Sequence, residues 1–375
     1  MKKSLGIYIH IPFCVQKCRY CDFCSFAGEG DGVKSAYADE IIGRIGAWRG
    51  ETAGYEADTV YFGGGTPSLM SAREIHRILD SINSVFSVSG SAEITLECNP
   101  ATADGEYFRA LRSMGVNRLS MGLQSASDRE LALLGRIHTA KDFENTFAQA
   151  RAAGFDNISA DLMYGIPDQD MDSFRATMRY LTALSPEHIS AYGLMIEQGT
   201  YFEKHAEELR LADDDMQYEM YLACTEYLAS CGYGKYEISN FARDGRRSRH
   251  NMRYWLGEEY LGFGVAAHSY FGGVRFGNSR DMGAFLRGED ITEERVCLDA
   301  DDVREEYIML RLRLSEGIDT RDYACRFGRD FFSDFQVVRD WAKQGFMRIL
   351  GDRIGFTDKG SFVSNTLLSE MLSLG

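Results

Sequence analysis

The chain has 375 residues, 45% of them hydrophobic and 26% charged, with a formal net charge of −15 at pH 7. This composition predicts a folded protein with a sizeable core and excludes a disordered one, and the acidic balance argues against a general nucleic-acid binder, which needs a basic surface to meet phosphates. No run of about 20 apolar residues occurs, so no transmembrane helix is predicted.

The first apolar run, Leu5–Ile11, follows two lysines and superficially resembles a signal peptide. His10 interrupts it, and cysteines follow in place of a small-residue cleavage site. We therefore interpret the run as a strand and expect a cytoplasmic protein. Peripheral association with a membrane stays open.

Strand-like runs alternate with amphipathic helical segments up to about residue 235. The six runs are Leu5–Ile11, Thr59–Phe62, Glu93–Glu97, Arg118–Leu123, Ile158–Met163 and His188–Leu194. The helical segments between them include Ser71–Phe86, Glu106–Met114, Lys141–Ala153 and Met171–Leu184. Six βα repeats with short connections predict an α/β domain over residues 1–235, a partial (β/α)6 barrel of the TIM type with its helices outside.

The pattern changes twice beyond the sixth repeat. Residues 236–300 are rich in glycine and aromatic residues and form a predicted connecting region with a basic burst, R-D-G-R-R-S-R-H-N. Residues 301–375 are predicted to form a small, mostly helical domain of winged-helix-like outline. Its expected elements are helices over Asp301–Leu314, Thr320–Phe327 and Asp330–Gln344, a strand–turn–strand over Met347–Phe356, and a last helix. Without a marked basic excess, this domain is interpreted as a packing or lid module and not as a DNA-binding one.

Four of the nine cysteines lie between positions 14 and 24, which favours metal binding over disulfides. Cys14, Cys18 and Cys21 form a C-x3-C-x2-C pattern, in which three thiolates hold a [4Fe–4S] cluster and leave one iron open. With Cys24 as a fourth thiolate, structural zinc is the alternative, although zinc sites usually use two separated ligand pairs. The remaining cysteines are expected to be small buried apolar residues: Cys98, Cys224, Cys231, Cys297 and Cys325.

Polar and glycine residues follow the predicted strands, at the edge of a βα sheet where functional sites form. A Gly63–Pro67 turn follows the second run, and its glycines allow the backbone to approach a carboxylate or phosphate. Other polar positions at the same edge are Glu97, Gln124, Arg136 and Asp161. Each alone fits a surface residue or a barrel salt bridge, but together they predict one polar pocket.

Several motifs in fixed order resemble the radical S-adenosylmethionine (SAM) branch that contains oxygen-independent coproporphyrinogen III oxidase. They are Y-I-H-I-P-F-C-x3-C-x-Y-C, G-G-G-T-P, E-x-N-P, S-M-G-L-Q-S and D-L-M-Y-G-I-P, and the resemblance covers nearly the whole chain. It implies that the three cysteines bind the cluster and that its open iron binds the amino and carboxylate groups of SAM. It also implies that Tyr8, Gly64 and Glu97 contact SAM. Tyr20 would pack near the adenine, and the residues implied to contact this SAM or a second one are Gly65, Thr66, Gln124, Arg136 and Asp161.

Two features separate this chain from the oxidases of that branch. The oxidases have a long extension before the cysteine loop, whereas Cys14 lies close to the start of this sequence. They also carry a C-x-C pattern after the third ligand, whereas Cys24 is displaced by one residue, so we leave Cys24 outside the cluster. His10, in the strand before the loop, is expected to hydrogen-bond there and not to ligate iron. His268 is likewise not taken as an iron ligand.

The segment His250–Trp255 resembles the H-N-x-x-Y-W motif of the HemW heme chaperones, relatives of these oxidases. A neutral imidazole at His250 is suited to ligate heme iron, and Tyr254 and Trp255 to flank the macrocycle. The arginines of the basic burst are candidates to pair with heme propionates: Arg243, Arg246, Arg247 and Arg249. The structural alternative is a loop-capping histidine, core aromatic residues and a solvated basic run.

The resemblance therefore implies a heme chaperone that carries a SAM-binding [4Fe–4S] cluster, binds heme and passes it to acceptor proteins, with respiratory proteins among the candidates. The alternative is a radical enzyme that oxidatively decarboxylates coproporphyrinogen III, and a third class is a radical SAM enzyme that acts on heme itself. Whether the chain is an enzyme is left open by the sequence. So are the number of SAM molecules and the oligomeric state.

Overall fold

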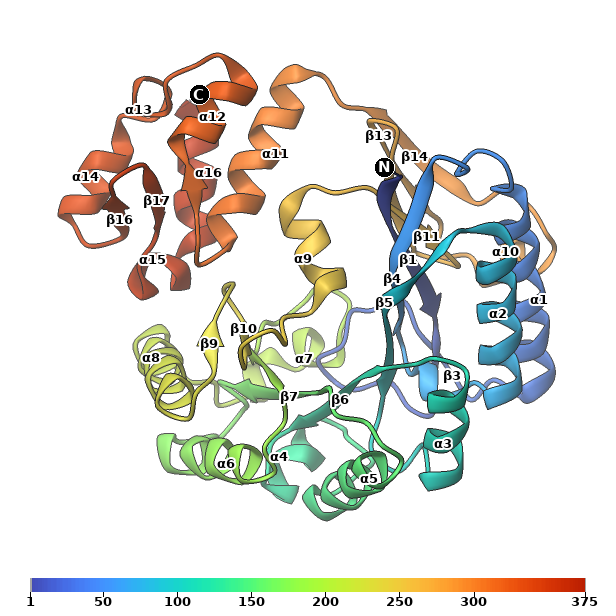
Figure 1. The fold of residues 1–375 in the computed structure, drawn as a ribbon. Helices are drawn as coiled ribbons and strands as arrows, with labels where there is room; N and C mark the ends of the chain where they lie inside the picture. The colour runs from blue at the N-terminus through green and yellow to red at the C-terminus, as the bar shows by residue number, and fades with distance from the viewer. Residues whose placement is uncertain (1, 375) are drawn as a thin grey trace.

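A computed structural model describes residues 2–374 of the chain. A single sheet of twelve strands dominates it, in the order β14-β13-β12-β11-β1-β4-β5-β6-β7-β8-β10-β9. The sheet curls around an interior and is covered by helices, while a separate group of helices packs at one side (Figure 1).

Six neighbouring strands of this sheet run parallel and form the barrel. They are β1 (Lys3–Ile11), β4 (Tyr55–Gly64), β5 (Val88–Cys98), β6 (Arg118–Gln124), β7 (Ile158–Tyr164) and β8 (His188–Gly193). These are the six runs predicted from the sequence, and all but β8 extend beyond the predicted bounds. β6 is buried along its whole length, as expected for a parallel strand covered on both faces. The predicted partial (β/α)6 barrel is confirmed.

Helices between these strands cover the outside of the barrel (Figure 1). Side chains cap most of their N-termini, with Ser71, Asp104 and Asp170 each accepting a backbone N–H, and Thr139 forms a capping box with Asp142. The helices are α1 (Asp31–Ala47), α2 (Ala72–Val85), α3 (Gly105–Ser113), α4 (Asp128–Leu133), α5 (Ala140–Ala152), α6 (Met171–Ala183), α7 (Tyr201–Lys204) and α8 (Asp214–Ser230).

The predicted connecting region contributes strands to the same sheet. After β9 (Gly234–Lys235), β10 (Asn240–Ala242) pairs antiparallel with β8, and α9 (Arg249–Leu256) follows. The chain then returns to the opposite edge, where β11 (Tyr260–Phe263) lies parallel to β1. An antiparallel extension completes the sheet with β12 (His268–Phe271), β13 (Val274–Asn278) and β14 (Thr292–Cys297), and α10 (Met282–Leu286) precedes β14. The sequence pattern did not predict this extension.

The C-terminal region has its own hydrophobic core, which includes Ile308, Tyr323, Trp341 and Met371. Its order of helices and its three-stranded sheet, β15-β17-β16, match the predicted winged-helix-like outline. The predicted helix over Asp330–Gln344 is divided in two at Phe335, whose φ of −127° and ψ of 66° are not helical. The elements are α11 (Ala300–Arg313), β15 (Ile318–Asp319), α12 (Thr320–Phe327), α13 (Phe331–Asp334), α14 (Val337–Lys343), β16 (Met347–Leu350), β17 (Arg353–Phe356), α15 (Asp358–Phe362) and α16 (Ser364–Leu374).

Ion pairs join this C-terminal region to the barrel. Lys235 Nζ lies 2.6 Å from Asp358 Oδ1, and Arg247 Nη1 lies 2.7 Å from Glu316 Oε1. The C-terminal region therefore packs against the rest of the molecule. Within residues 2–374, no helix is long and apolar enough to cross a bilayer.

The five cysteines outside the N-terminal loop differ in their surroundings. Cys98 and Cys224 are buried as predicted, and Cys231 is half-buried. Cys297 and Cys325 are exposed, so the prediction that all five are buried was wrong. Cys297 ends β14, a strand exposed along its whole length, and no apolar periodicity in the sequence marked that edge.

Candidate functional site

The carboxyl ends of the parallel strands bring the predicted site residues into one region. The β1–β4 register sets Tyr8 beside Tyr61 and His10 beside Gly63, and the β5–β6 register sets Glu97 beside Ser120. Asp161 lies in the next strand, β7. Residues separated by about 150 positions therefore meet because parallel strands end at the same edge.

His10 fastens the cysteine loop to β1. Its Nε2 lies 3.0 Å from the carbonyl oxygen of Cys24, and its Nδ1 lies 3.0 Å from the Tyr8 hydroxyl. Because a carbonyl can only accept, Nε2 carries the proton and Nδ1 accepts from Tyr8. Burial lowers the pKa of His10, which keeps the ring neutral. His10 thus supports the loop by hydrogen bonding, as the sequence analysis expected.

The glycine turn after β4 leaves room for the His10 ring. Gly64 has a φ of +115°, and a Cβ there would lie 2.5 Å from His10 Cε1. A Cβ on Gly65 would lie 2.8 Å from the carbonyl oxygen of Phe13, directly before the first cysteine. The turn and the cysteine loop are therefore packed backbone against backbone, which only glycine permits.

Two carboxyl groups line the interior beneath the turn. Glu97 accepts hydrogen bonds from the Gly64 N–H at 3.0 Å and from the Tyr61 hydroxyl at 2.8 Å. Burial raises the pKa of Glu97 to about 7 in spite of these bonds, and burial raises the pKa of Asp161 to about 6. Such acids favour a ligand that brings an ammonium group or hydroxyls, because these groups would donate hydrogen bonds to the ionised carboxylates.

Arg118 is a buried cation in the same interior that the sequence analysis did not single out. Its charge lowers the pKa of both Glu97 and Asp161, although burial outweighs it at each. An arginine at the first position of a predicted strand is usually a surface residue, so the sequence alone offered no signal for it.

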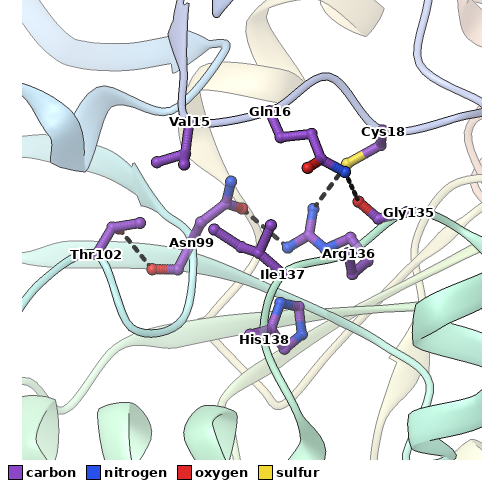
Figure 2. A pocket seen from close by; sticks show the side chains of 9 residues that line it. All are labelled: Val15, Gln16, Cys18, Asn99, Thr102, Gly135, Arg136, Ile137 and His138. Carbon is purple, nitrogen blue, oxygen red and sulfur yellow. Dashed lines mark hydrogen bonds between the residues drawn. The ribbon is translucent and has the colours of Figure 1, made fainter. Parts of the chain in front are cut away.

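A chain of polar contacts connects the first two cysteines, and Figure 2 shows its part from Asn99 through Arg136 to Cys18. Cys14 Sγ lies 3.6 Å from Thr66 Oγ1, which accepts a hydrogen bond from Asn99 Nδ2 at 2.8 Å. Asn99 Oδ1 accepts from Arg136 Nη2 at 3.0 Å, and Arg136 Nη1 lies 3.7 Å from Cys18 Sγ. Hydrogen-bond donors beside thiolates stabilise their negative charge, which is what cluster ligands require.

Asn99 is a site residue that the sequence analysis did not predict. It stands in the E-x-N-P motif, two positions after Glu97, so the signal was in the sequence but only Glu97 was selected. Together with Cys18 and Arg136, it lines an open pocket beside the cysteine loop (Figure 2). The other lining residues are Val15, Gln16, Thr102, Gly135, Ile137 and His138.

The cysteine loop is fixed to the helical side of the barrel at Arg19. Its N–H donates to the Leu134 carbonyl, and its carbonyl accepts from the Phe202 N–H, both at 3.0 Å. The neighbouring Tyr20 packs on the apolar cluster that contains Leu134 and Phe202.

The thiols of the loop differ in exposure. Cys14, Cys18 and Cys21 are half-buried, while Cys24 is buried and burial raises the pKa of its thiol. Burial also raises the pKa of Cys21 to about 11. Three accessible thiols on one loop, beside donors from Thr66 and Arg136, fit a three-thiolate cluster. Within residues 2–374, no three His, Cys, Asp or Glu side chains lie close enough together to hold one metal ion.

Gln124, at the end of β6, adopts a left-handed backbone with a φ of +70°. Its amide lies over Gly122, where a Cβ would come within 2.6 Å of Nε2. Arg136 also reaches the Gly122 carbonyl, at 3.1 Å. A non-glycine residue in this conformation is strained, and such residues cluster at functional sites.

His250, in the first turn of α9, is buried against side chains of β4. Its Nδ1 is 2.9 Å from Thr59 Oγ1, and its Nε2 is 2.8 Å from the Tyr254 hydroxyl. Its ring stacks on Tyr61, with the centroids 5.1 Å apart. Burial lowers the pKa of His250 to about 3, so the imidazole is neutral. Both ring nitrogens are engaged, and iron ligation would require one of these bonds to exchange.

The four arginines of the basic burst have partners in the structure. Arg246 lies 3.5 Å from Asp156, Arg247 is 2.7 Å from Glu316, and Arg249 is 3.6 Å from Asp58. Arg243 stacks on Tyr233 at 5.0 Å. Pairing with propionates would therefore require these contacts to be exchanged.

Comparison with known proteins places this arrangement in a family. The family model of the radical SAM superfamily matches residues 8–181, and the family model of the HemN C-terminal domain matches residues 298–363. Heme chaperone HemW of Bacillus subtilis is 33% identical, over 97% of this chain and 98% of its own length. Heme chaperone HemW of Escherichia coli is 32% identical, with 98% of each chain covered.

The chain belongs to the HemW family of radical SAM proteins. Membership of the superfamily implies a SAM-binding [4Fe–4S] cluster, which the three half-buried thiols and their donors fit. A mitochondrial radical SAM domain-containing protein of Bos taurus is also similar, at 31% identity over 98% of this chain and 87% of its own length.

The fold is that of coproporphyrinogen III oxidase (HemN) from Escherichia coli. The TM-score is 0.86, and the match covers 100% of this chain and 90% of that one, at 22% sequence identity. At this identity the likeness establishes the fold alone. It confirms a radical SAM α/β fold with a helical C-terminal region.

Proposed function

We propose that this chain is a heme chaperone that binds heme, carries a SAM-binding [4Fe–4S] cluster, and passes heme to acceptor proteins. The observation that carries the proposal is similarity over nearly the full length to relatives named heme chaperone HemW. The motif at His250–Trp255 supports it, because it offers a neutral imidazole next to aromatic side chains.

We propose Cys14, Cys18 and Cys21 as the cluster ligands. When bound, the cluster supplies an open iron that can take the amino and carboxylate groups of SAM. Thr66 and Arg136 stabilise the thiolates, since each places a donor near a cysteine sulfur.

SAM would lie between the glycine turn and the two buried carboxyls. The Gly64 N–H, which donates to Glu97 Oε2 at 3.0 Å, and the Gly65 N–H, which donates to the Ile11 carbonyl at 2.8 Å, would exchange these partners to meet its carboxylate. Glu97 and Asp161 are suited to its amine or ribose hydroxyls. The remaining proposed contacts are Tyr8, Tyr20, Thr66, Gln124 and Arg136.

We propose that heme binding depends on His250. Its imidazole is neutral, as iron ligation needs, but Nε2 is held by the Tyr254 hydroxyl. Ligation would therefore exchange the Tyr254 hydrogen bond for iron. The acceptors are proposed to be heme proteins, respiratory ones included, and the cytoplasm is the proposed location because the cluster needs reduced thiols.

Two assays on anaerobically reconstituted protein test the proposal. In the first, heme is titrated into wild type and His250→Ala while the Soret band is followed; wild type should bind with a defined stoichiometry and the variant more weakly. In the second, protein, reductant and SAM are incubated with coproporphyrinogen III, and no protoporphyrinogen should form. Turnover at enzyme-like rates would replace the chaperone by the oxidase. Failure of both assays would leave an unassigned radical SAM protein.

A further inference from the structure

The exposed apolar side chains gather at the edge of the barrel that carries the cysteine loop. Within residues 2–374, ten large apolar or aromatic side chains are exposed, and six of them lie at or beyond the carboxyl ends of the barrel strands. Single exposed apolar side chains are ordinary on a protein surface, whereas a group of them on one face marks an interaction site. The six are Val15, Phe23, Ile137, Tyr192, Met195 and Tyr201.

Three of these six side chains surround the cysteine loop itself. Phe23, between the third and fourth cysteines, is 68% exposed, and Val15, directly after the first cysteine, is 53% exposed. Ile137 is as exposed as Val15, and the two line the pocket beside Cys18 (Figure 2). Two of the three belong to the loop proposed to hold the cluster, so a molecule that contacts them lies next to the cluster.

Cations accompany these apolar side chains, although the formal net charge of the chain is −15. Lys17 and Arg19 are exposed in the loop, and its only acid, Asp22, has the Arg280 guanidinium 3.6 Å away. Burial raises the pKa of Cys21, and the charge of Lys17 partly opposes this rise, which places the lysine near the thiols. The loop is therefore locally basic on an acidic molecule.

Support of the cluster alone does not explain these side chains. Arg136 already places a donor at a cysteine sulfur. The Arg19 guanidinium turns away from the thiols, since it donates to the Leu133 carbonyl at 3.3 Å and stacks on the Tyr201 ring at 5.1 Å. Phe23 offers no donor and keeps most of its surface in solvent. Apolar side chains with charges around them are the usual composition of a protein interface.

We propose that an acidic one-electron donor protein docks on the loop patch, which consists of Val15, Lys17, Arg19, Phe23 and Ile137. The inference rests on the cluster of the proposed function and adds a partner for it. Electron-transfer encounters use small interfaces, and opposite charges speed their association. With a flavin donor, one electron leaves the hydroquinone, which becomes the semiquinone. The same electron enters the cluster, which passes from the 2+ to the 1+ state, and no bond forms or breaks.

Stopped-flow reduction of the anaerobically reconstituted protein tests the proposal. Photoreduced flavodoxin, an acidic flavin protein, is mixed with wild type, Lys17→Glu, Phe23→Ser and Lys343→Glu, and the loss of cluster absorbance is followed. Lys343 is the matched control, because it is a 77% exposed lysine on α14 of the C-terminal region. Lys343→Glu should leave the rate of reduction unchanged.

The two patch variants should differ in their salt dependence. Lys17→Glu should lower the second-order rate constant about 10-fold at low salt, because electrostatic steering raises such rates by about 10-fold or more. The difference should shrink toward about 1 M salt, where charges are screened within about 3 Å. Phe23→Ser should lower the rate several-fold at every salt concentration, because it removes an apolar contact.

Dithionite, a small reductant that needs no docking, separates docking from damage to the cluster. All four proteins should hold the same amount of iron and should react with dithionite at the same rate. If Lys17→Glu loses iron, the lysine supports the cluster and the docking proposal is wrong. The salt dependence of wild type needs no variant: its rate with flavodoxin should fall as salt rises, and a flat or rising rate would overturn the proposal.

Two other results would also overturn the docking proposal alone. In the first, flavodoxin reduces all four proteins at one rate. In the second, neither flavodoxin nor an acidic ferredoxin reduces wild type, although dithionite does. If wild type holds no iron after reconstitution, the cluster of the proposed function fails instead.

Discussion

Gly64→Ala should destabilise the protein through His10. At a φ of +115°, the new methyl carbon would lie 2.5 Å from the His10 ring, which must move. Movement would break the bonds from His10 to Tyr8 and to the Cys24 carbonyl. The end of the cysteine loop would then lose its attachment to β1.

Two contributions set the size of this effect. A non-glycine residue in a disfavoured backbone region costs about 1–3 kcal/mol. Each of the two hydrogen bonds contributes about 0.5–1.5 kcal/mol. The expected loss is therefore about 2–6 kcal/mol, a large part of the 5–15 kcal/mol by which domains are usually stable.

Urea unfolding of the cluster-free chain measures the effect on Gly64→Ala, His10→Ala and the double variant. Gly54→Ala is the control, because a Cβ there meets open space. Removing the ring removes the clash, so the double variant should lose less than the two single changes together. The reasoning is refuted if Gly64→Ala resembles Gly54→Ala, or if the single effects add within about 0.5 kcal/mol.

Three further predictions concern the ligand sites. SAM should bind more tightly as the pH rises from about 6 to about 8. The pKa of Glu97 is raised to about 7 and that of Asp161 to about 6, so both acids ionise over this range. Calorimetry measures the SAM affinity at each pH, and Glu97→Gln should make it less dependent on pH. Asn99→Ala should lower the iron bound on anaerobic reconstitution, since it cuts the polar chain between Thr66 and Arg136. Tyr254→Phe should strengthen heme binding by about 0.5–1.5 kcal/mol in a Soret titration, because His250 Nε2 loses its competing partner.

Each of these has a result that contradicts it. A SAM affinity that is flat or falls over the pH range would exclude the two carboxyls as ionised contacts. Iron content equal to that of Asn83→Ala, a change on the exposed side of α2, would show that the polar chain does not support the cluster. Loss of heme binding in Tyr254→Phe would mean that the hydroxyl itself is needed.

The same two acids, Glu97 and Asp161, also make the folding stability depend on pH. Because the folded-state pKa values of Glu97 and Asp161 are raised, these acids favour folding most at low pH, where they are protonated in both states. Their contribution falls as the pH rises through about 6 to 7. Bound SAM should reverse this trend, because an ammonium favours the ionised acids.

The barrel was predictable because its signals are local. Each parallel strand is a short apolar run. Helices α2 and α5 each have a capping side chain and an amphipathic face, and their predicted bounds lie within one residue of the observed ones. The meeting of Glu97 and Asp161 followed from the rule that parallel strands share one carboxyl edge.

What was missed depends on partners distant in sequence. β11 joins the sheet beside β1, about 250 positions away, and no periodicity records that pairing. Arg247 was read as a candidate for propionates, but its partner Glu316 belongs to another domain. The exposure of Cys297 likewise follows from an edge strand that the sequence did not reveal.

Transfer of heme to an acceptor tests the central claim most directly. The heme-loaded, cluster-containing protein is mixed with increasing amounts of a heme-free b-type cytochrome, and the acceptor's spectrum is followed. A chaperone hands heme over in a complex, so the account predicts a transfer rate that increases with acceptor concentration before it saturates. A rate that is independent of acceptor concentration and equal to spontaneous heme release would contradict it.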